Sequence, residues 1–311
     1  MPKCLIRPYG YIGDILFASG IAKKLKQEGQ FDVVDFANGF KQVEPLLLQN
    51  PWLDGVITLA NPTERPLHGI GLAGTGWDKM FQLTETQKTI PPPLQFQMEC
   101  GVRYPDTLYD VYTVPEMDEL VQERYPNPYV AVMEPNTWRA KAFAFTEDEY
   151  NRAVDVPYKG YGGRLRDIPG IISALAKDFQ LVTVGLTATS MQVANTVAPP
   201  ERSLRYDASV LKHAQFFIGA EGGLANVAAG VGCKTVLTSD FVWQLYGPKG
   251  CLKRIAEPKL GPRYYFPDEG HIDLNPYATD TDVLDEYRAV LSGKKTAADY
   301  RYEWMETHVT I

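Results

Sequence analysis

The stretch CLIRPYGYIGDIL, residues 4–16, decides the fold class of this chain. Its first four residues are typical of a short strand, and the glycines at positions 10 and 13 predict a turn. A helix is predicted at 15–27, because its apolar residues recur at spacings of three and four. Lysines in its last turn suit the helix dipole, and Gly29 is typical of a helix stop. A strand therefore runs through a glycine turn into an amphipathic helix.

The alternation of strand and helix continues along the first third of the chain. Strands are predicted at 31–36, 55–59 and 78–83, and helices at 40–49 and 94–100. Strands that alternate with helices pair in parallel, with the helices as crossover connections. We therefore expect an α/β fold built on a parallel sheet.

A second series of the same kind follows Pro126-Asn127-Pro128, which we take as the junction between two domains. A helix at 117–125 precedes this junction, and a strand at 129–133 follows it. Further elements are predicted as strands at 181–184, 216–218 and 234–237, and as helices at 168–178, 191–197, 223–230 and within 276–291. We expect two facing Rossmann-like domains around a cleft, at 1–126 and 127–284, with a C-terminal helix at about 285–311 that packs back on the first domain.

Composition limits the class of protein. A length of 311 residues suits two domains, and 45% hydrophobic with 22% charged residues is close to the globular average. The net charge of −7 disfavours broad binding to DNA or to an anionic membrane, but a local basic cleft stays compatible with it. The four cysteines form no Cys-x-x-Cys pair, so we expect a reducing compartment and no disulfide framework. The four histidines lie far apart and form no local metal motif.

The chain carries no stretch of 18 apolar residues, so the sequence predicts no membrane span. Its N-terminus lacks the apolar core of a signal peptide, because Arg7 and Asp14 interrupt it. We therefore expect a cytoplasmic protein, with a peripheral position at the inner membrane face compatible with this expectation.

The first candidate for chemistry is the turn Gly10-Tyr11-Ile12-Gly13-Asp14 between strand and helix. A turn of this kind places backbone N–H groups and the Asp14 carboxylate at the carboxyl edge of the sheet. A carboxylate there can act as a general base toward a hydroxyl. Aspartate is also a favoured capping residue, so the residue pattern leaves catalysis and helix capping both open.

The second candidate is the sequence IGAEGGLANVAAG at 218–230. A strand ends in an acid and two glycines, and a helix of small residues begins. Glycines allow phosphates to approach the backbone, and a helix N-terminus favours negative charge. Glu221 is suited to accept hydrogen bonds from sugar hydroxyls. The alternative is a tight turn packed against a neighbouring strand; we favour a binding role.

The third candidate, EPNTWRAK at 134–141, follows the first strand of the second domain. Arg139 and Lys141 are suited to pair with a diphosphate, and a solvated loop is the alternative. Other signals are weaker. The literal G-x-G-x-x-G at 69–74 does not follow a strand, and Asp280-Thr281-Asp282 is better explained as a helix cap than as a metal motif. The basic patch at 249–263 fits an anionic acceptor or a solvated loop equally well.

Four stretches in order along the chain resemble one known family. Residues 12–26 open with Gly-Asp and end in Leu-Lys, and 51–57 looks like the exit from the family's second helix. Residues 129–141 resemble its strand, Pro-Gly loop and lysine, and 217–236 resemble its signature of Ile-Gly, an acidic turn, Ala-Ala and a closing strand. Together they resemble glycosyltransferase family 9, the ADP-heptose:lipopolysaccharide heptosyltransferase-like group.

The resemblance implies a GT-B fold and an inverting transfer of sugar from a nucleoside diphosphate sugar to an acceptor hydroxyl, without metal or other cofactor. It implies that the N-terminal domain binds the acceptor, a glycan, a lipid-linked molecule or another hydroxyl-bearing compound. Asp14 matches the proposed catalytic base of the family, and we place Tyr9, Tyr11 and Gly13 beside the acceptor. Lys141 matches a lysine that contacts donor phosphate. The donor site implied in the C-terminal domain further includes Asn136, Thr137, Arg139, Gly185, Glu221, Gly222, Gly223 and Leu224.

The chain departs from the family pattern at the implied donor site. Glu221 replaces the usual aspartate, Gly222 the usual serine and Asn226 the usual histidine. The Pro-Gly loop is Pro135-Asn136 here, and 156–166 looks like an insertion. We therefore expect a divergent member whose donor sugar is not heptose.

Two other activities remain open. A phage-type DNA-modifying glycosyltransferase would share the chemistry and act on a hydroxymethylated base, supported by the patch at 249–263 and disfavoured by the net charge. A nucleotide-sugar epimerase of the same fold would act on the donor alone and needs a histidine near the sugar. His213, just before the strand at 216–218, is the only histidine near the motifs.

Overall fold

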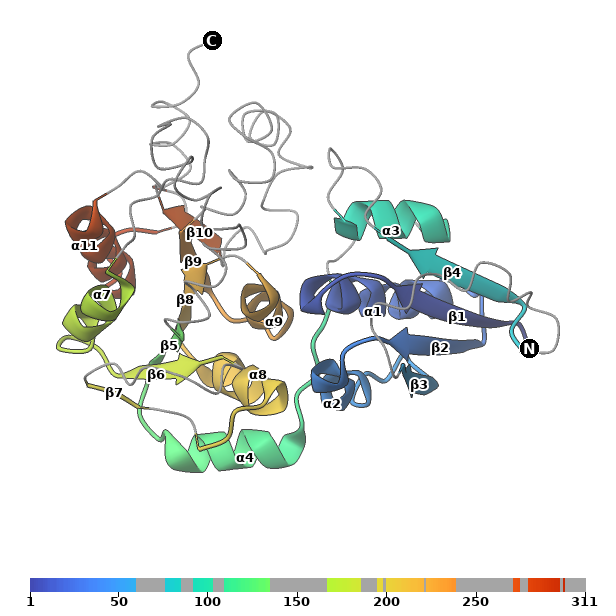
Figure 1. The fold of residues 1–311 in the computed structure, drawn as a ribbon, viewed down its shortest axis with the longest axis horizontal. Coiled ribbons are helices and arrows are strands. Elements are labelled where there is room, and N and C mark those ends of the chain that lie inside the picture. Colours follow the sequence, from blue (N-terminus) through green and yellow to red (C-terminus); the bar gives the residue numbers. More distant parts are fainter. Residues whose placement is uncertain are drawn as a thin grey trace, which may run out of the picture. The chain divides into compact units, whose positions relative to one another are not determined.

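The computed structural model describes residues 1–59, 76–84, 92–102, 109–134, 167–185, 195–197, 200–220, 222–238, 271–274, 279–296 and 299. The chain divides into two compact units, Met1–Pro115 and Glu116–Ile311. Each unit is built on its own parallel sheet with helices connecting the strands (Figure 1). The expected α/β class is therefore confirmed.

The sheet of the first unit has the order β3-β2-β1-β4 and is parallel throughout. Its strands are β1 (Lys3–Pro8), β2 (Val33–Asn38), β3 (Gly55–Thr58) and β4 (Lys79–Leu83). The central strand β1 is almost wholly buried, with apolar Cys4, Leu5 and Ile6 in its middle, and it pairs with β2 on one side and β4 on the other. All four strands lie where the alternation in the sequence predicts them.

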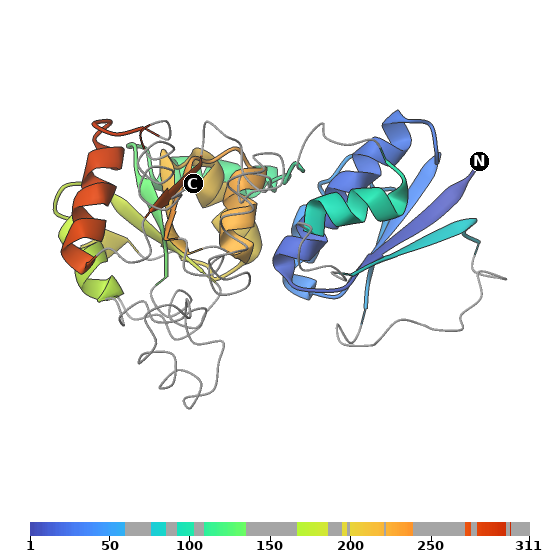
Figure 2. The same cartoon turned by 90° about the horizontal axis from the view of Figure 1, so that it is seen from above.

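Helix α1 (Ile12–Gln27) follows β1, and α3 (Pro92–Cys100) follows β4. The two helices contact each other on one face of the sheet (Figure 2). The apolar stripe predicted for α1 is its core face, because all of these residues are buried: Ile15, Leu16, Ala18, Ile21, Ala22 and Leu25. The 3.6-residue period of the sequence is thus matched by burial.

The helix predicted at 40–49 is wrong in its extent. The structure has a 3₁₀ turn, η1 (Lys41–Val43), followed by the short helix α2 (Glu44–Leu47). Pro45 is the reason, because proline lacks the N–H that a helix interior requires but suits a first turn.

The sheet of the second unit has the order β10-β9-β8-β5-β6-β7 and is also parallel. Its strands are β5 (Val130–Met133), β6 (Leu181–Val184), β7 (Thr196–Val197), β8 (Phe216–Ala220), β9 (Thr235–Thr238) and β10 (His271–Leu274). Counted along the chain from β5, this is the doubly wound order 3-2-1-4-5-6. The first strand, β5, lies at the centre, between β6 and β8.

Helices cover both faces of this second sheet. α7 (Ile168–Leu175) and α11 (Asp280–Leu291) pack together on one face, and α8 (Leu204–His213) and α9 (Gly223–Gly230) on the other (Figures 1 and 2). α4 (Pro115–Arg124) precedes the first strand. Asp282 accepts a hydrogen bond from the Thr279 backbone N–H at the start of α11, which confirms the capping role predicted for the Asp280-Thr281-Asp282 motif.

Two predictions in this unit differ from the structure. Thr196 and Val197 form the edge strand β7, not the end of a helix, because these β-branched residues pair with β6. Helix α8 is not predicted, although its sequence holds a signal. Ser203 caps it by accepting the N–H of Tyr206, and apolar residues follow at the spacing of one helical face.

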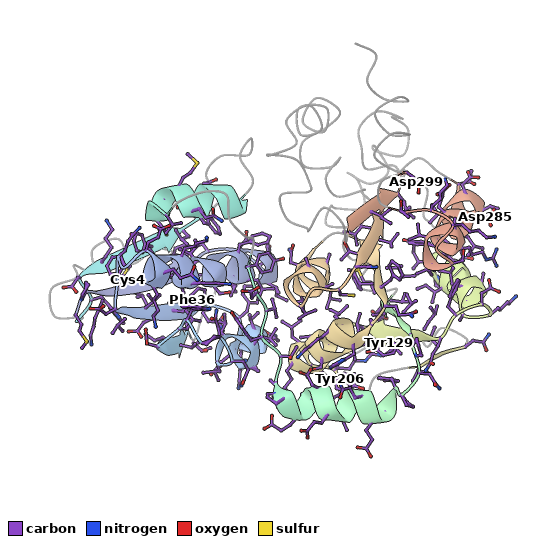
Figure 3. The ribbon with its side chains drawn as sticks, turned by 180° about the vertical axis from the view of Figure 1, so that it is seen from behind. Cys4, Phe36, Tyr129, Tyr206, Asp285 and Asp299 are labelled. Carbon is purple, nitrogen blue, oxygen red and sulfur yellow. The ribbon has the colours of Figure 1, made fainter. Side chains whose placement is uncertain are left out.

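The core of each unit is a set of fully buried side chains, several of which are labelled in Figure 3. Cys4 and Phe36 lie in the first sheet. In the second unit Tyr129 donates its hydroxyl to the Val210 carbonyl at 2.7 Å, and Tyr206 donates to the Tyr125 hydroxyl at 3.2 Å. These bonds keep the tyrosine hydroxyls satisfied inside the core.

Candidate functional site

In each sheet the strand order indicates where a ligand would bind. In an open parallel α/β sheet, ligands bind beyond the carboxyl ends of the strands where the connections change direction. In the first unit this point lies between β1 and β4, and in the second between β5 and β8. The chain that follows β1, β5 and β8 begins at positions 9, 134 and 221, which are the three segments singled out in the sequence. Each of the three segments therefore follows a strand that borders the point where its sheet changes direction.

Asp14 occupies the third position of α1, beyond the carboxyl end of β1. Its Oδ2 accepts a hydrogen bond from the Tyr11 backbone N–H at 2.8 Å, so the capping role left open by the sequence is present. The side chain is half-buried. A carboxylate offers about four acceptor positions on two oxygens, so one cap bond is compatible with accepting a proton.

Gly10 makes room for this carboxylate. Its φ of +139° is unfavourable for any side chain, and a Cβ there would lie 2.2 Å from Asp14 Oδ2. Gly13 is buried in the first turn of α1, where it packs rather than presents a surface. The glycines of the motif thus shape the position of Asp14.

Two aromatic residues of the predicted acceptor side lie near Asp14 in sequence. Tyr9 is half-buried, and its backbone N–H donates to the Leu83 carbonyl at 2.7 Å, which ties the end of β1 to the end of β4. Tyr11 is 79% exposed, and its ring centroid lies 6.2 Å from that of Phe40 in the chain after β2. Sequence reasoning missed Phe40, which only the neighbouring position of β2 brings to this edge.

Arg7 is a second residue that the sequence analysis did not select. It lies in β1 only 3% exposed, with its guanidinium carbon 5.0 Å from the centre of the Tyr9 ring. Burial raises the pKa of the Tyr9 hydroxyl, and the Arg7 charge opposes that shift. A charged residue inside an otherwise apolar strand was the available signal.

In the second unit, Gly222 begins the candidate anion site at helix α9. Its φ of 146° and ψ of −160° belong to a region that only glycine enters readily. The first hydrogen bond of α9 runs from the Asn226 N–H to the Gly222 carbonyl at 2.9 Å. The N–H groups of Gly223 and Leu224 precede that bond and lack acceptors within the helix, which is the arrangement that binds anions.

β5 and β8 approach each other closely at this edge. A Cβ on Gly219 would lie 2.7 Å from the Met133 Cβ, so β8 requires glycine there. Glu134 follows β5, is fully buried, and its backbone N–H donates to the Val184 carbonyl at 2.7 Å. The ends of β8, β5 and β6 thus form one continuous edge of the sheet.

Gly185 continues this edge after β6. It has a φ of 151°, and its N–H donates to Asp207 Oδ2 at 3.1 Å. Asp207 is fully buried in the first turn of α8, and burial raises the pKa of its carboxyl to about 7. Asp207 was not predicted, because α8 itself was not, and the contact joins residues 22 positions apart.

Several predicted site residues lie outside the described part of the chain. They are Asn136, Thr137, Arg139, Lys141 and Glu221. The same holds for the basic patch at 249–263, the insertion at 156–166, the G-x-G-x-x-G stretch at 69–74 and nearly all of the Gly-rich loop at 61–76. The described donor-side residues are therefore Gly185, Gly222, Gly223 and Leu224.

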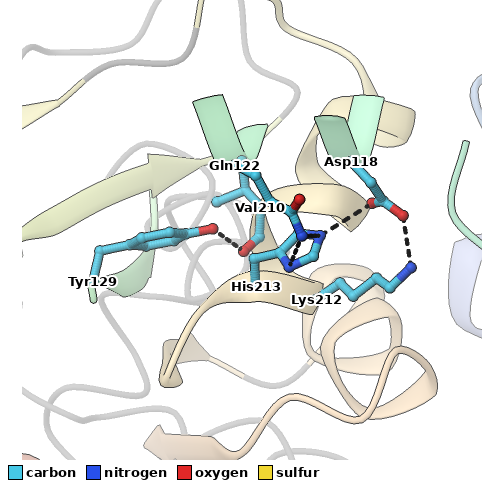
Figure 4. A network of polar contacts seen from close by, with 6 residues as sticks. All are labelled: Asp118, Gln122, Tyr129, Val210, Lys212 and His213. Carbon is cyan, nitrogen blue, oxygen red and sulfur yellow. Dashed lines mark hydrogen bonds and ion pairs between the residues drawn. The ribbon is translucent and has the colours of Figure 1, made fainter. Parts of the chain in front are cut away.

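His213 lies at the amino-terminal end of the strands of the second sheet, opposite the carboxyl ends. It ends α8, immediately before β8 begins, whereas the candidate site lies where β8 ends. Its Nε2 is 3.6 Å from Asp118 Oδ1, and the Gln122 amide nitrogen lies 3.3 Å from its Nδ1 (Figure 4). Lys212 pairs with Asp118 at 2.6 Å beside it. This network joins α8 to α4 and places His213 away from the carboxyl ends of the strands.

Within the described ranges no group of three or more His, Cys, Asp or Glu residues is placed to hold a metal ion. Cys4, Cys100 and Cys233 are buried free thiols. None of the helices that the structure describes is long and apolar enough to cross a membrane.

No protein-family model matches the sequence, and no curated protein matches it either. Solved structures do match the fold. A glycosyl transferase family 9 protein from Veillonella parvula DSM 2008 matches with a TM-score of 0.58 at 11% identity, covering 94% of this chain and 98% of that one.

Two heptosyltransferases of E. coli match in the same way. ADP-heptose LPS heptosyltransferase II has a TM-score of 0.54 at 12% identity, covering 94% of this chain and 99% of its own. Heptosyltransferase WaaC with ADP-2-deoxy-2-fluoro heptose has a TM-score of 0.53 at 12% identity, covering 94% and 100%. At these identities the likeness is one of fold, and the chain accordingly has the GT-B fold of these glycosyltransferases.

Proposed function

We propose that this protein is an inverting, metal-independent glycosyltransferase that moves a sugar from a nucleoside diphosphate sugar to an acceptor hydroxyl. One observation carries the proposal. The Asp14 carboxylate lies where the connections of the first sheet change direction. The N-terminus of α9, at Gly222 and Gly223, lies where the connections of the second sheet change direction. Base and diphosphate site are what such a transfer needs.

In the proposed reaction Asp14 removes the proton of the acceptor hydroxyl. The acceptor oxygen then forms a bond to the anomeric carbon while the bond from that carbon to the donor phosphate oxygen breaks. The configuration inverts, and the nucleoside diphosphate leaves with the bonding electron pair. Tyr9 and Tyr11 would contact the acceptor, whereas Gly13, which is buried in the first turn of α1, would shape the backbone beside Asp14.

The leaving diphosphate gains negative charge as the bond breaks. Backbone N–H groups at the start of α9 are already oriented for an anion, so they would stabilise this charge without reorganising. The donor site would be completed by Gly185 and Leu224 together with Asn136, Thr137, Arg139, Lys141 and Glu221, with the lysine and arginine on phosphate and the glutamate on the sugar.

The donor is tested first by a thermal-shift screen across UDP-, GDP-, ADP-, CMP- and dTDP-sugars. A ligand that binds only the folded state raises the melting temperature by mass action. ADP-sugars belong in the screen because the WaaC structure contains an ADP-heptose analogue. The proposal fails if none of the UDP-, GDP-, ADP- and dTDP-sugars shifts the melting temperature of a protein that unfolds cooperatively; CMP-sugars, which carry a single phosphate, serve as the contrast.

The donor that binds is then incubated with and without candidate acceptors, and nucleoside diphosphate release is measured. The proposed transferase releases diphosphate faster with a glycan or lipid-linked acceptor. Conversion of the donor without any acceptor would instead indicate an epimerase. Release that requires hydroxymethylated duplex DNA would indicate the DNA-modifying class.

The free thiols Cys4, Cys100 and Cys233 support action in a reducing, cytoplasmic setting.

A further inference from the structure

Asp207 is a carboxylate in an unusual position. It lies in the first turn of α8, with its side chain fully buried. Its Oδ2 accepts the Gly185 N–H at 3.1 Å, and its Oδ1 has no hydrogen-bond partner within the described ranges. A buried carboxylate that keeps one oxygen unsatisfied costs stability, so its retention calls for a role.

The partner of Asp207 is Gly185, the residue directly after β6, at the edge of the candidate donor site. Gly185 has a φ of 151°, and the two polar groups of the residue are both held from the segment around α8. Asp207 takes its N–H, and Arg202 Nη1 lies 3.5 Å from its carbonyl oxygen. The preceding residue, Val184, accepts the Glu134 N–H, so the end of β6 is tied to the end of β5, where the connections change direction.

The described elements around Asp207 bring few charged groups near it. β6 and α9, which pack against α8, contain no titratable side chain. Glu201 and Arg202 precede α8, and Glu201 is already paired with Arg205 at 2.8 Å. Tyr125, directly after α4, meets Tyr206, and Asp118 of α4 meets α8 at the far end, at Lys212. Burial raises the pKa of Asp207 to about 7, against the opposing effects of the Gly185 N–H and Arg202.

We propose that Asp207 is a positioning residue of the nucleotide-sugar site, whose carboxylate holds the Gly185 backbone in the conformation that accepts the nucleotide and so makes nucleotide affinity depend on pH. The inference rests on the proposed function. The ionised carboxylate accepts a stronger, charge-assisted hydrogen bond than the protonated form does. Nucleotide binding is therefore tighter above neutral pH than below it, and bound nucleotide in turn lowers the pKa of Asp207.

The first experiment measures binding of the best nucleotide sugar from the screen by calorimetry at pH 6 and pH 8. A free phosphate monoester has a second ionisation near neutral pH, which would itself change binding with pH. The diphosphate of a nucleotide sugar has no such terminal group, so a nucleotide sugar is the right probe. We expect the wild-type affinity for the nucleotide sugar to rise roughly three- to ten-fold from pH 6 to pH 8. A change of this size is expected when a neutral hydrogen bond becomes charge-assisted. Asp207→Asn keeps an acceptor oxygen but cannot ionise, so its affinity stays the same at both values.

Ser209→Ala is the matched control. Ser209 is buried in the same helix, and its hydroxyl has no hydrogen-bond partner within the described ranges. This variant keeps the pH dependence of the wild type. A nucleotide affinity that changes equally with pH in wild type and Asp207→Asn overturns the inference and leaves the proposed function standing.

The second experiment observes Gly185 without any ligand. The sequence contains two Val-Gly pairs, Val184-Gly185 and Val231-Gly232. Labelling with carbonyl-¹³C valine and ¹⁵N glycine therefore selects two amide signals, and Gly232 serves as the internal control. We expect the Gly185 amide to titrate with a midpoint near the pKa of about 7 in the wild type and to lose this titration in Asp207→Asn.

The two measurements separate the possible failures. A Gly185 amide that does not titrate overturns the inference, whatever the nucleotide result. A Gly185 amide that titrates in a protein that binds no nucleotide sugar overturns the proposed function, and with it the role of Asp207 in that site. Titration together with pH-dependent binding confirms the inference.

Discussion

The Asp14 carboxylate accepts a hydrogen bond from the backbone N–H of Tyr11 at 2.8 Å, three residues earlier in the chain. This bond fixes the start of α1 and holds the carboxylate at the carboxyl end of β1. The same geometry therefore caps the helix and suits the proposed role of Asp14 as a general base. The capping bond limits the rotation of the side chain, which is what a positioned general base requires.

Asp14→Asn and Asp14→Ala separate these two uses. An asparagine oxygen can still accept the Tyr11 N–H, so Asp14→Asn keeps nearly wild-type stability, whereas Asp14→Ala loses about 1 kcal/mol with the cap. Neither variant can take a proton, so sugar transfer falls about 10²-fold or more in both. Urea unfolding and initial rates measure the two effects. Near-normal turnover in Asp14→Asn would reduce Asp14 to a cap.

Asp282 offers the matched control for Asp14. It stands at the same position of α11, and its carboxylate accepts the N–H of Thr279 at 3.0 Å. α11 follows the edge strand β10, which β9 and β8 separate from β5. Asp282→Ala should therefore lose a similar stability and keep full transfer activity.

Gly10→Ala should disable the enzyme through Asp14. The new Cβ would stand 2.2 Å from Asp14 Oδ2 and must displace the carboxylate. Gly29→Ala is the control, because Gly29 has a φ of +68° and, among the described residues beyond its chain neighbours, none lies within 4 Å of the place that a new methyl group would take. We expect Gly29→Ala to cost about 1 kcal/mol of stability with unchanged transfer, and Gly10→Ala to cost more and to lower the rate at least about tenfold. Equal rates in the two variants would contradict the role of Gly10.

Gly222→Ala tests the anion site. Its φ of 146° and ψ of −160° lie in a region essentially restricted to glycine, so the substitution costs on the order of 1–3 kcal/mol and turns the first N–H groups of α9 away from the donor. Gly232→Ala, with a φ of +81° at the other end of the helix, shares the backbone strain but not the site. Calorimetry with the donor sugar should show weakened binding in Gly222→Ala alone; unchanged affinity there would argue against this helix as the phosphate site.

Asp207 also makes a prediction about stability and pH. Its folded pKa of about 7 is above the ordinary value of 3.8, so the native state binds a proton that the unfolded chain releases between these values. The stabilisation is complete below about pH 4 and is lost as pH rises through 7. The free energy of unfolding of Asp207→Asn relative to wild type should thus increase from pH 5 to pH 8, by on the order of a few kcal/mol at most. Urea titrations at both pH values measure it, and an unchanged difference would show that Asp207 does not titrate in this range.

Local patterns predicted most of the elements near the candidate site. The strand before Gly10, the helix after Asp14 and the helix 223–230 follow from periodicity and from turn residues within a few positions. Errors arose where local signals compete. At 40–49 the apolar spacing predicts one helix, but Pro45 limits the α-helix to a short segment. Thr196 and Val197 are predicted in a helix, but they pair with β6 as a strand.

By itself, the sequence determined the alternation of strands and helices and the positions of Asp14 and Gly222 at the starts of two helices. These features depend on groups within about four residues of each other, so short-range periodicity and backbone sterics suffice. The tertiary structure alone decided which strands are neighbours, and hence where each sheet changes direction. It also brought Phe40 to Tyr11 and Asp207 to Gly185. Contacts of that kind, like the burial that raises the pKa of Asp207, arise only when distant segments pack together.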